Sequence, residues 1–391
     1  MRRAWRRAAA ALLLLALAGL GVFFFVVPGL VDRQLNGVAL AAPYRPGERA
    51  LALHRRLFVA DLHDDALLWS RDLLERHDHG HVDVPRLREG HVALQVFATV
   101  TKSPRGLNFE RNPSDSDTIT TLAIAQRWPP RTWTSLLERA LYQGERLHAA
   151  AAASGGRLRV IHTGGELARA LAEPAPADGR VLAVLAAEGL HPLEGRLENV
   201  DRMADAGFRM AGLTHFFDNE LGGSAHGLVK GGLTPFGRAV VRRLEQRGIL
   251  VDLAHASPRV IDDVLAQATR PVVVSHTGVQ GTCPGPRNLS DEHLRRIAAN
   301  GGVVGIGYFH GAVCGLDPAA IVQAIRHAVR VAGIEHVALG SDFDGATRAA
   351  FDTTGVVLVT QGLLDAGYSD EDIAAVMGGN VRRLLLAQLP P

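Results

Sequence analysis

The sequence has few cysteines and almost no lysine. Its 391 residues contain two cysteines, Cys283 and Cys314, which is too few for a disulfide-dense small protein or a four-cysteine zinc ribbon. One disulfide and two free thiols both remain open for this pair. Lys102 and Lys230 are the only lysines among the 42 basic residues. With 47% hydrophobic and 21% charged residues, the composition is that of a folded globular protein and excludes a disordered chain.

Acidic residues are absent from the first 31 positions, where Arg2, Arg3, Arg6 and Arg7 carry four positive charges. Without these four, 38 basic residues face the 40 acidic ones, so the remainder of the chain has a net charge of −2. The basic character therefore belongs mainly to the N-terminus. No basic face for nucleic acid is indicated, and we expect no nucleic-acid partner.

A run of 20 residues from Ala8 to Val27 contains no charged or strongly polar side chain. At about 1.5 Å per residue it can span a bilayer core of roughly 30 Å. Arginines on its N-terminal side should stay in the cytoplasm, which directs the rest of the chain to the periplasm or the exterior. We therefore expect a transmembrane segment over residues 1–30, a linker over 31–50 and membrane attachment through this helix.

A cleaved signal peptide is the alternative interpretation of the same run. The apolar core of a signal peptide is shorter, about 7 to 15 residues, but the small residues of Ala39-Leu40-Ala41 could form a cleavage site. Cleavage would leave a secreted protein.

The rest of the chain, residues 51–391, has no low-complexity linker and no recognisable repeat, which favours one catalytic domain. Short apolar runs alternate with helical patterns, as in a (β/α)₈ barrel of the TIM type. An open doubly wound sheet is the alternative. The expected strands are Leu57–Leu62, Val92–Ala98, Val181–Ala187, Met210–Leu213, Ile249–Leu253, Pro271–Val274, Val303–Gly307 and Val337–Leu339. The expected helices include Thr234–Arg247 and Pro318–Ala332, with extra helices near Thr118–Trp128 and Trp133–Ala153 in a long insertion from Thr101 to Ala177.

Polar side chains follow most of these apolar runs. In a closed parallel barrel the carboxyl ends of the strands share one rim, where active sites are built. The residues in question are His63 and Asp65 after the first run, Glu188 after the third, His215 after the fourth, His255 after the fifth, His276 after the sixth and Asp342 after the eighth. Four histidines and three carboxylates should therefore converge there.

Several of these residues are of metal-ligating type. His63 and Asp65 are two positions apart, so in extended backbone they point to the same side. His255 and His276 each follow a strand of Val, Ile and Leu, and Glu188 ends an apolar run where an isolated carboxylate would be costly. Nitrogen and oxygen ligands in this mixture suit zinc, with manganese, cobalt or iron as substitutes.

The sequence resembles the membrane dipeptidase (renal dipeptidase) family over about residues 55–390. The resemblance rests on separate motifs in the same order. They are Asp61-Leu62-His63-Asp64-Asp65, Val82-Asp83-Val84-Pro85-Arg86-Leu87 with Gly90 and Gln95, Glu188-Gly189, Leu213-Thr214-His215 with Asn219, Leu233-Thr234-Pro235-Phe236-Gly237, Asp252-Leu253-Ala254-His255, Ser275-His276, Pro286-Arg287-Asn288 with Asp291, Gly340-Ser341-Asp342-Phe343-Asp344-Gly345 and Gly379-Asn380.

The resemblance implies a dipeptidase with two zinc ions per chain. One ion would be bound by His63 and Asp65, the other by His255 and His276, with Glu188 bridging them. A hydroxide between the ions would attack the peptide bond. His215 would polarise the scissile carbonyl, Arg287 would bind the free carboxylate of the dipeptide, and Asp342 would transfer protons. Glu188, His215 and Asp342 are thus the expected catalytic residues, and His215, Arg287 and Asp342 the expected substrate-binding ones.

Two other functions remain as alternatives. Another barrel metallohydrolase, such as an amidase or lactonase, usually has His-x-His after the first strand, where this chain has His63 and Asp65. A non-catalytic anchored binding protein would be expected to have lost a ligand. His79, His81 and His91 resemble a metal-binding tract, but we interpret them as non-ligands, and we expect Asp344 to be a helix N-cap. The preferred dipeptide, the native metal and the presence of a homodimer are left open.

Overall fold

Eight parallel strands close into a barrel in the computed structural model, which describes residues 2–174 and 179–391. Each strand pairs in parallel with its neighbours, and the pairing of β2 with β4 closes the ring. The predicted barrel is confirmed and the open sheet is excluded. Its strands are β1 (Val59–Asp64), β2 (Val92–Val100), β4 (Val181–Glu188), β5 (Phe208–Gly212), β6 (Leu250–Asp252), β7 (Val273–Thr277), β8 (Val303–Ile306) and β9 (Val337–Leu339).

A ninth strand, β3 (Leu158–Val160), was not predicted. It pairs in parallel with the first residues of β4, whose later residues pair with β5. It therefore lies outside the barrel ring and does not change the order of the strands within it.

The side chains of β4 alternate between the barrel interior and the surrounding helices. Leu182, Val184 and Ala186 belong to one buried cluster, which contains inward-facing residues of most other strands, and Ala183 and Leu185 belong to another. Successive side chains of a strand point to opposite faces. Glu188 has the same parity as the first group, which directs its carboxylate into the mouth of the barrel.

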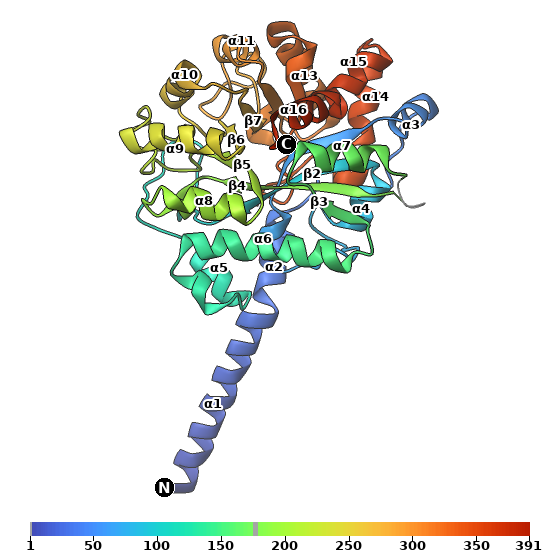
Figure 1. Ribbon diagram of the computed structural model, residues 1–391. Coiled ribbons are helices and arrows are strands. Elements are labelled where there is room, and N and C mark those ends of the chain that lie inside the picture. Colours follow the sequence, from blue (N-terminus) through green and yellow to red (C-terminus); the bar gives the residue numbers. More distant parts are fainter. Residues whose placement is uncertain (1, 175–178) are drawn as a thin grey trace.

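Helices surround the barrel (Figure 1). The predicted helices over residues 234–247 and 318–332 are found as α9 and α13, and those of the long insertion as α5 and α6. The last residues of that insertion, 175–177, lie outside the described residues. The helices are α3 (Glu48–His54), α4 (Val84–Glu89), α5 (Ile119–Ala125), α6 (Leu136–Ala153), α7 (Gly164–Ala172), α8 (Glu198–Asp205), α9 (Pro235–Gln246), α10 (Pro258–Gln267), α11 (Asp291–Ala299), α12 (His310–Val313), α13 (Pro318–Ala332), α14 (Val357–Asp365), α15 (Asp370–Ala374) and α16 (Asn380–Gln388).

Several of the barrel helices begin at a side chain that caps their free N–H groups. Thr234 accepts from the N–H of Gly237 at the start of α9, and Asp317 accepts from that of Ala320 at the start of α13. In both helices a proline occupies the first turn, where its missing N–H is not needed. These local signals explain why the boundaries of α9 and α13 could be placed from the sequence.

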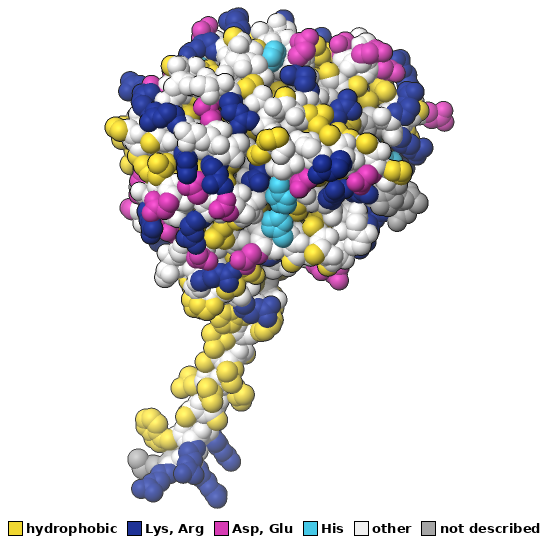
Figure 2. Space-filling view, viewed as in Figure 1, with side chains coloured by type: hydrophobic (Ala, Val, Ile, Leu, Met, Phe, Trp, Pro, Cys, Tyr) yellow, Lys and Arg dark blue, Asp and Glu magenta, His cyan; other side chains and the backbone are white. Residues whose placement is uncertain are grey.

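The N-terminal helix α1 (Arg2–Phe25) projects from the body as a long stem and leads into α2 (Val27–Leu35) (Figure 1). Its side chains are hydrophobic, with arginines at the far end (Figure 2). Residues 2–35 are long and apolar enough to cross a membrane, with a mean hydropathy of 2.8 over the best window. A signal sequence would meet the same criteria.

Candidate metal and active site

The eight residues predicted for the site all lie at the rim formed by the carboxyl ends of the strands. Each is less than a tenth exposed. His63, Glu188 and His276 belong to the strands themselves, and the others lie in the segments that follow them. The structure therefore brings together every residue in the predicted set, which consists of His63, Asp65, Glu188, His215, His255, His276, Arg287 and Asp342.

The carboxylate of Glu188 is the centre of the cluster. Its Oε1 lies 3.0 Å from His255 Nε2, 3.1 Å from His276 Nε2 and 3.5 Å from His63 Nε2. Its Oε2 lies 3.2 Å from His215 Nε2. Four imidazoles from four different strand ends thus meet at one carboxylate.

A second group of oxygens lies on the His63 side of the cluster. Asp65 Oδ1 is 3.5 Å from His63 Nε2, and a ligand atom of Asp342 lies within 4.8 Å of both side chains. The pKa of Asp342 is raised to about 7, because burial and the neighbouring Asp65 raise it by more than His63 and Arg287 lower it. The carboxylates gathered here give this part of the rim a negative electrostatic potential.

The donor atoms of the cluster fit divalent cations. Among the described residues, His63 Nε2 and Asp65 Oδ1 are buried without a hydrogen-bond partner. Donors on one tetrahedral zinc ion, with bonds of 2.0–2.1 Å, are about 3.3 Å apart. Separations of 3.0 to 3.5 Å around Glu188 match that value. Burial would lower the pKa of His63, yet Glu188 and Asp65 raise it to about 10, so this position attracts positive charge.

Ser275 and Asp252 orient the imidazoles and were not predicted as functional residues. The Ser275 hydroxyl donates to Asp252 Oδ2 over 2.6 Å, so its oxygen accepts from His276 Nδ1–H at 2.8 Å. This leaves the lone pair of His276 Nε2 pointing at the cluster. The sequence did contain a signal for Asp252: an aspartate within an apolar strand needs a buried polar partner.

Asp61 plays a similar part beneath His63. Its Oδ1 accepts from the backbone N–H groups of His63 and Ser341, both at 3.0 Å. The carboxylate therefore ties the end of β1 to the segment after β9, from which Asp342 comes.

His215 is neutral in this environment. Burial lowers its pKa well below the ordinary value, and nearby His191 and His226 lower it further. Its Nδ1 has no hydrogen-bond partner among the described residues. Gly189 has a φ of +77° and lies so close that a Cβ there would be 3.0 Å from His215 Cβ and would overlap His191. The Glu188-Gly189 motif thus allows the His215 segment to approach the carboxylate.

Arg287 lies in the loop after β7 with 5% of its surface exposed. Its Nη2 donates to the His276 carbonyl over 2.7 Å, and its Nε is buried without a hydrogen-bond partner. Burial lowers the pKa of the guanidinium, whereas Asp342 and Glu188 raise it. The side chain is therefore fixed beside the cluster and retains donor capacity.

The Arg287 loop is held by a disulfide between Cys283 and Cys314. The bond joins the loop after β7 to the chain that follows α12, and no described cysteine is free. The neighbouring Asn288 adds hydrogen bonds from its Nδ2 to the Cys283 carbonyl (2.7 Å) and to the Ala312 carbonyl (3.1 Å). Of the two states left open by the sequence, the structure has the disulfide.

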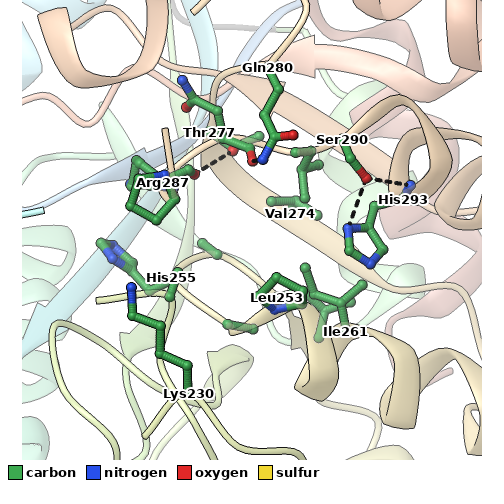
Figure 3. Close-up of a pocket in the computed structure, with 17 residues that line it drawn as sticks. Lys230, Leu253, His255, Ile261, Val274, Thr277, Gln280, Arg287, Ser290 and His293 are labelled. Carbon is green, nitrogen blue, oxygen red and sulfur yellow. Dashed lines mark hydrogen bonds between the residues drawn. The ribbon is translucent and has the colours of Figure 1, made fainter. Parts of the chain in front are cut away.

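Beside Arg287 and His255 the surface is hollowed into a cavity of about 360 Å³. Figure 3 shows the side chain of Lys230 extending into it beneath His255, with Leu253, Ile261 and Val274 along the wall. The cavity therefore combines cationic groups with an apolar wall.

The predicted N-cap role of Asp344 is wrong, because its carboxylate accepts from the backbone N–H groups of His81 and Val82 (2.7 and 3.0 Å) and pairs with Arg71. His79, His81 and His91 belong to none of the metal-ligand groups found among the described residues, and their interpretation as non-ligands stays a prediction.

Comparison with known proteins identifies relatives over most of the chain. Residues 47–388 match the family described as Membrane dipeptidase (Peptidase family M19). A curated relative, Dipeptidase aclJ of Aspergillus oryzae, is 28% identical over 352 residues, which cover 84% of this chain and 78% of the relative.

Solved structures share the fold. The probable dipeptidase PvdM from Pseudomonas aeruginosa superposes with a TM-score of 0.73 at 20% identity, covering 88% of this chain and 98% of the other. A metallopeptidase from Rhodobacter sphaeroides, liganded with a phosphinate mimic of the dipeptide L-Ala-D-Ala, superposes with a TM-score of 0.69 at 24% identity, covering 85% and 99%.

Proposed function

Because the chain belongs to the membrane dipeptidase family and is thus a metal-dependent hydrolase of peptide bonds, we propose that its rim site binds two divalent ions, zinc in the first place, and cleaves dipeptides. The observation that carries the proposal is the position of Glu188, whose Oε1 lies within 3.5 Å of the Nε2 atoms of His63, His255 and His276, so that one carboxylate is within reach of both proposed ligand pairs. His255 and His276 would bind one ion, His63 and Asp65 the second, and Glu188 both.

When bound, the two ions would acidify water to hydroxide at neutral pH and offset the negative charge that develops on the scissile carbonyl. His215 lies at Glu188 Oε2, and its neutral ring has one N–H. We assign that N–H to the carbonyl oxygen of the substrate, where it would strengthen as charge develops. Asp342 would take up a proton from water and deliver it to the leaving amine.

Arg287 would bind the free carboxylate of the dipeptide. A guanidinium pairs with a carboxylate in a planar, two-pronged geometry, and burial strengthens that pairing. The cavity beside Arg287 would then receive the C-terminal residue of the substrate against Leu253 and Val274. Binding at this distance from the metals would hold the scissile bond in place and restrict activity to short peptides.

We further propose that α1 stays attached and anchors the enzyme with its barrel outside the cytoplasm. The arginines at the start of α1 favour the cytoplasmic side. The Cys283–Cys314 disulfide supports the same orientation, since disulfides persist in oxidising compartments. Protease treatment of intact cells followed by fractionation tests this, and a chain found whole in the cytosol would refute it.

The deciding experiment for the function is metal analysis of the full-length, detergent-extracted protein together with release of amino acids from a dipeptide panel. L-Ala-D-Ala belongs in the panel because the Rhodobacter sphaeroides relative binds a mimic of it. We expect about two ions per chain and loss of hydrolysis on chelation. Full activity with one ion or none would refute the two-metal site, and activity only on amides or lactones would favour the alternative hydrolase.

A further inference from the structure

The segment that directly follows the apolar stem is docked on the catalytic rim. Asp32, on the last turn of α2, is 3% exposed, and Asn36, which directly follows α2, is 2% exposed. Beyond α2, the N–H of Ala39 donates to the Ala349 carbonyl over 2.9 Å, and the N–H of Ala349 donates to the Gly37 carbonyl over 3.0 Å. Residues 32–40, called here the juxtamembrane segment, are thus paired with the chain that follows Asp342.

Arg71 links this segment to the rim through buried ion pairs. Its Nε donates to Asp32 Oδ2, and its Nη2 forms an ion pair with Asp344 Oδ2, both at 2.8 Å. Asn36 Nδ2 donates to the other oxygen of Asp32 at 2.8 Å. Gly80 has a φ of +67°, and a Cβ there would collide with the Arg71 guanidinium. The network therefore has room only because residue 80 lacks a side chain.

Asp344 in turn shapes the segment that carries Asp342. Both aspartates have a φ of +61°, a left-handed conformation that non-glycine residues hold only when their surroundings impose it. Both the side chain and the backbone of Asp344 are held by hydrogen bonds. Its carboxylate accepts from the backbone N–H of His81, and its carbonyl accepts from Trp69 Nε1 at 2.7 Å. Burial would raise the pKa of Asp344, but Arg71 and His81 hold it below the ordinary value.

We propose that Asp32 is a positioning residue for the active site: through Arg71 and Asp344 it holds the left-handed turn that places Asp342 at the rim. The membrane stem is then continuous with a working part of the barrel. Cleavage at Ala39-Leu40-Ala41 would remove Asp32 and leave Arg71 with one of its two carboxylate partners. The inference rests on the proposed function, because the proton-transfer role of Asp342 is part of that proposal, and it adds the residues that position Asp342.

The test compares full-length variants in detergent micelles. Asp32→Asn removes the charge with little change of shape, Asp32→Glu keeps the charge, and Asn36→Ala is a gentler variant that removes one hydrogen bond to Asp32. Arg33→Ala is the matched control, because Arg33 lies on the same helix and pairs with Asp78 at the surface. Hydrogen exchange of residues 80–85 and 341–350, metal content, and kcat and KM on L-Ala-D-Ala are measured for each.

For Asp32→Asn we expect faster exchange confined to these two segments, unchanged metal content and a kcat lower by about 10- to 100-fold, since small displacements at a reacting group have effects of that size. KM should change by less than about twofold, because Arg287 is untouched. Asp32→Glu should recover part of kcat, Asn36→Ala should show a weaker form of both effects, and Arg33→Ala should match the wild type.

Normal kcat with faster local exchange would overturn the proposal and leave Asp32 a purely structural role. Faster exchange over the whole barrel would do the same. If Asp32→Asn does not fold, Asn36→Ala decides by the same criteria. If the wild type hydrolyses no dipeptide, the proposed function fails, and exchange at residues 341–350 alone then decides whether the juxtamembrane segment orders this turn.

Discussion

The Ser275 hydroxyl donates a 2.6 Å hydrogen bond to Asp252, and this bond determines which nitrogen of the adjacent His276 carries the proton. With its one hydrogen committed to Asp252, Ser275 can only accept from His276 Nδ1–H. Two side chains that touch no substrate therefore control the protonation of a ligand.

Replacing Ser275 by alanine should weaken metal binding by about 10- to 100-fold, which is the usual effect of removing a group that orients a ligand. Competition with a chelator measures it. Ser70→Ala is the control, since Ser70 is exposed. Equal chelator sensitivity of both variants would show that the tautomer of His276 is set by something else.

Glu188→Gln should disturb both metal sites, whereas His63→Ala should mainly empty one. The reason is the central position of the Glu188 carboxylate, with three Nε2 atoms within 3.5 Å of one oxygen. Metal counts per chain measure the difference. Loss of the same number of ions in both variants would contradict a shared carboxylate.

Much of the barrel could be predicted from the sequence because its strands are short apolar runs with clear ends. The run before Glu188, for example, becomes β4, and the polar residue that ends it lies at the rim. β3 escaped prediction because it has three residues and its centre is Arg159, so it has no apolar run. Its pairing with β4 depends on a partner distant in sequence.

The positions of seven site residues at the rim could be predicted because each ends or follows a strand and has a characteristic side chain, whereas Arg287 was identified through the resemblance to the family. The supporting contacts could not be predicted. In the sequence Asp32 is a single charged residue in the expected linker. Only the fold brings Arg71 to it and, through Arg71, connects it to Asp344. Whether Cys283 and Cys314 are bonded was open for the same reason, since 31 residues separate them in sequence.

The stability of the barrel should fall as the pH drops from about 6.5 toward 4, in part because of His54. Its Nε2 lies 3.0 Å from the Gly90 carbonyl and its Nδ1 2.8 Å from Thr360 Oγ1, a pair of contacts that suits one neutral tautomer. Burial lowers the pKa of His54 to about 4, against 6.5 in the unfolded chain. Between these values the unfolded chain binds more protons, so acid favours unfolding.

The wild type should lose up to about 3 kcal/mol of unfolding free energy through His54 over this range. His54→Gln should be less stable at pH 7, and its deficit should shrink as the pH falls. Urea denaturation at a series of pH values measures both, with exposed His310→Gln as control. A deficit that does not change with pH would exclude titration of His54 as the cause.

Removing the disulfide should affect both stability and substrate binding. By loop-closure entropy, a bond across 31 residues contributes about 4 kcal/mol. The double variant Cys283→Ala/Cys314→Ala should lose stability of that order and show a raised KM, because the Arg287 loop is freed. Denaturation and steady-state kinetics measure the two effects. A normal KM would mean that Asn288 alone holds the loop.

Arg287→Lys should weaken hydrolysis of dipeptides by reducing recognition of the free carboxylate. Lysine keeps the charge but loses the planar pair of donors, at a cost of about 2 to 4 kcal/mol in transition-state stabilisation for a desolvated pair. The present geometry favours a large effect, since Arg287 is 5% exposed and its Nε has no partner among the described residues.

The measurement is kcat/KM for wild type and Arg287→Lys on a free dipeptide and on the same dipeptide with an amidated C-terminus. The amide has no carboxylate to bind, so the variant should differ little from the wild type on it. Arg295→Lys, an exposed arginine on α11, controls for the general effect of the exchange. Equal losses on both substrates would mean that Arg287 acts through its hydrogen bond to the His276 carbonyl, and so on the metal ligand, instead of on the substrate.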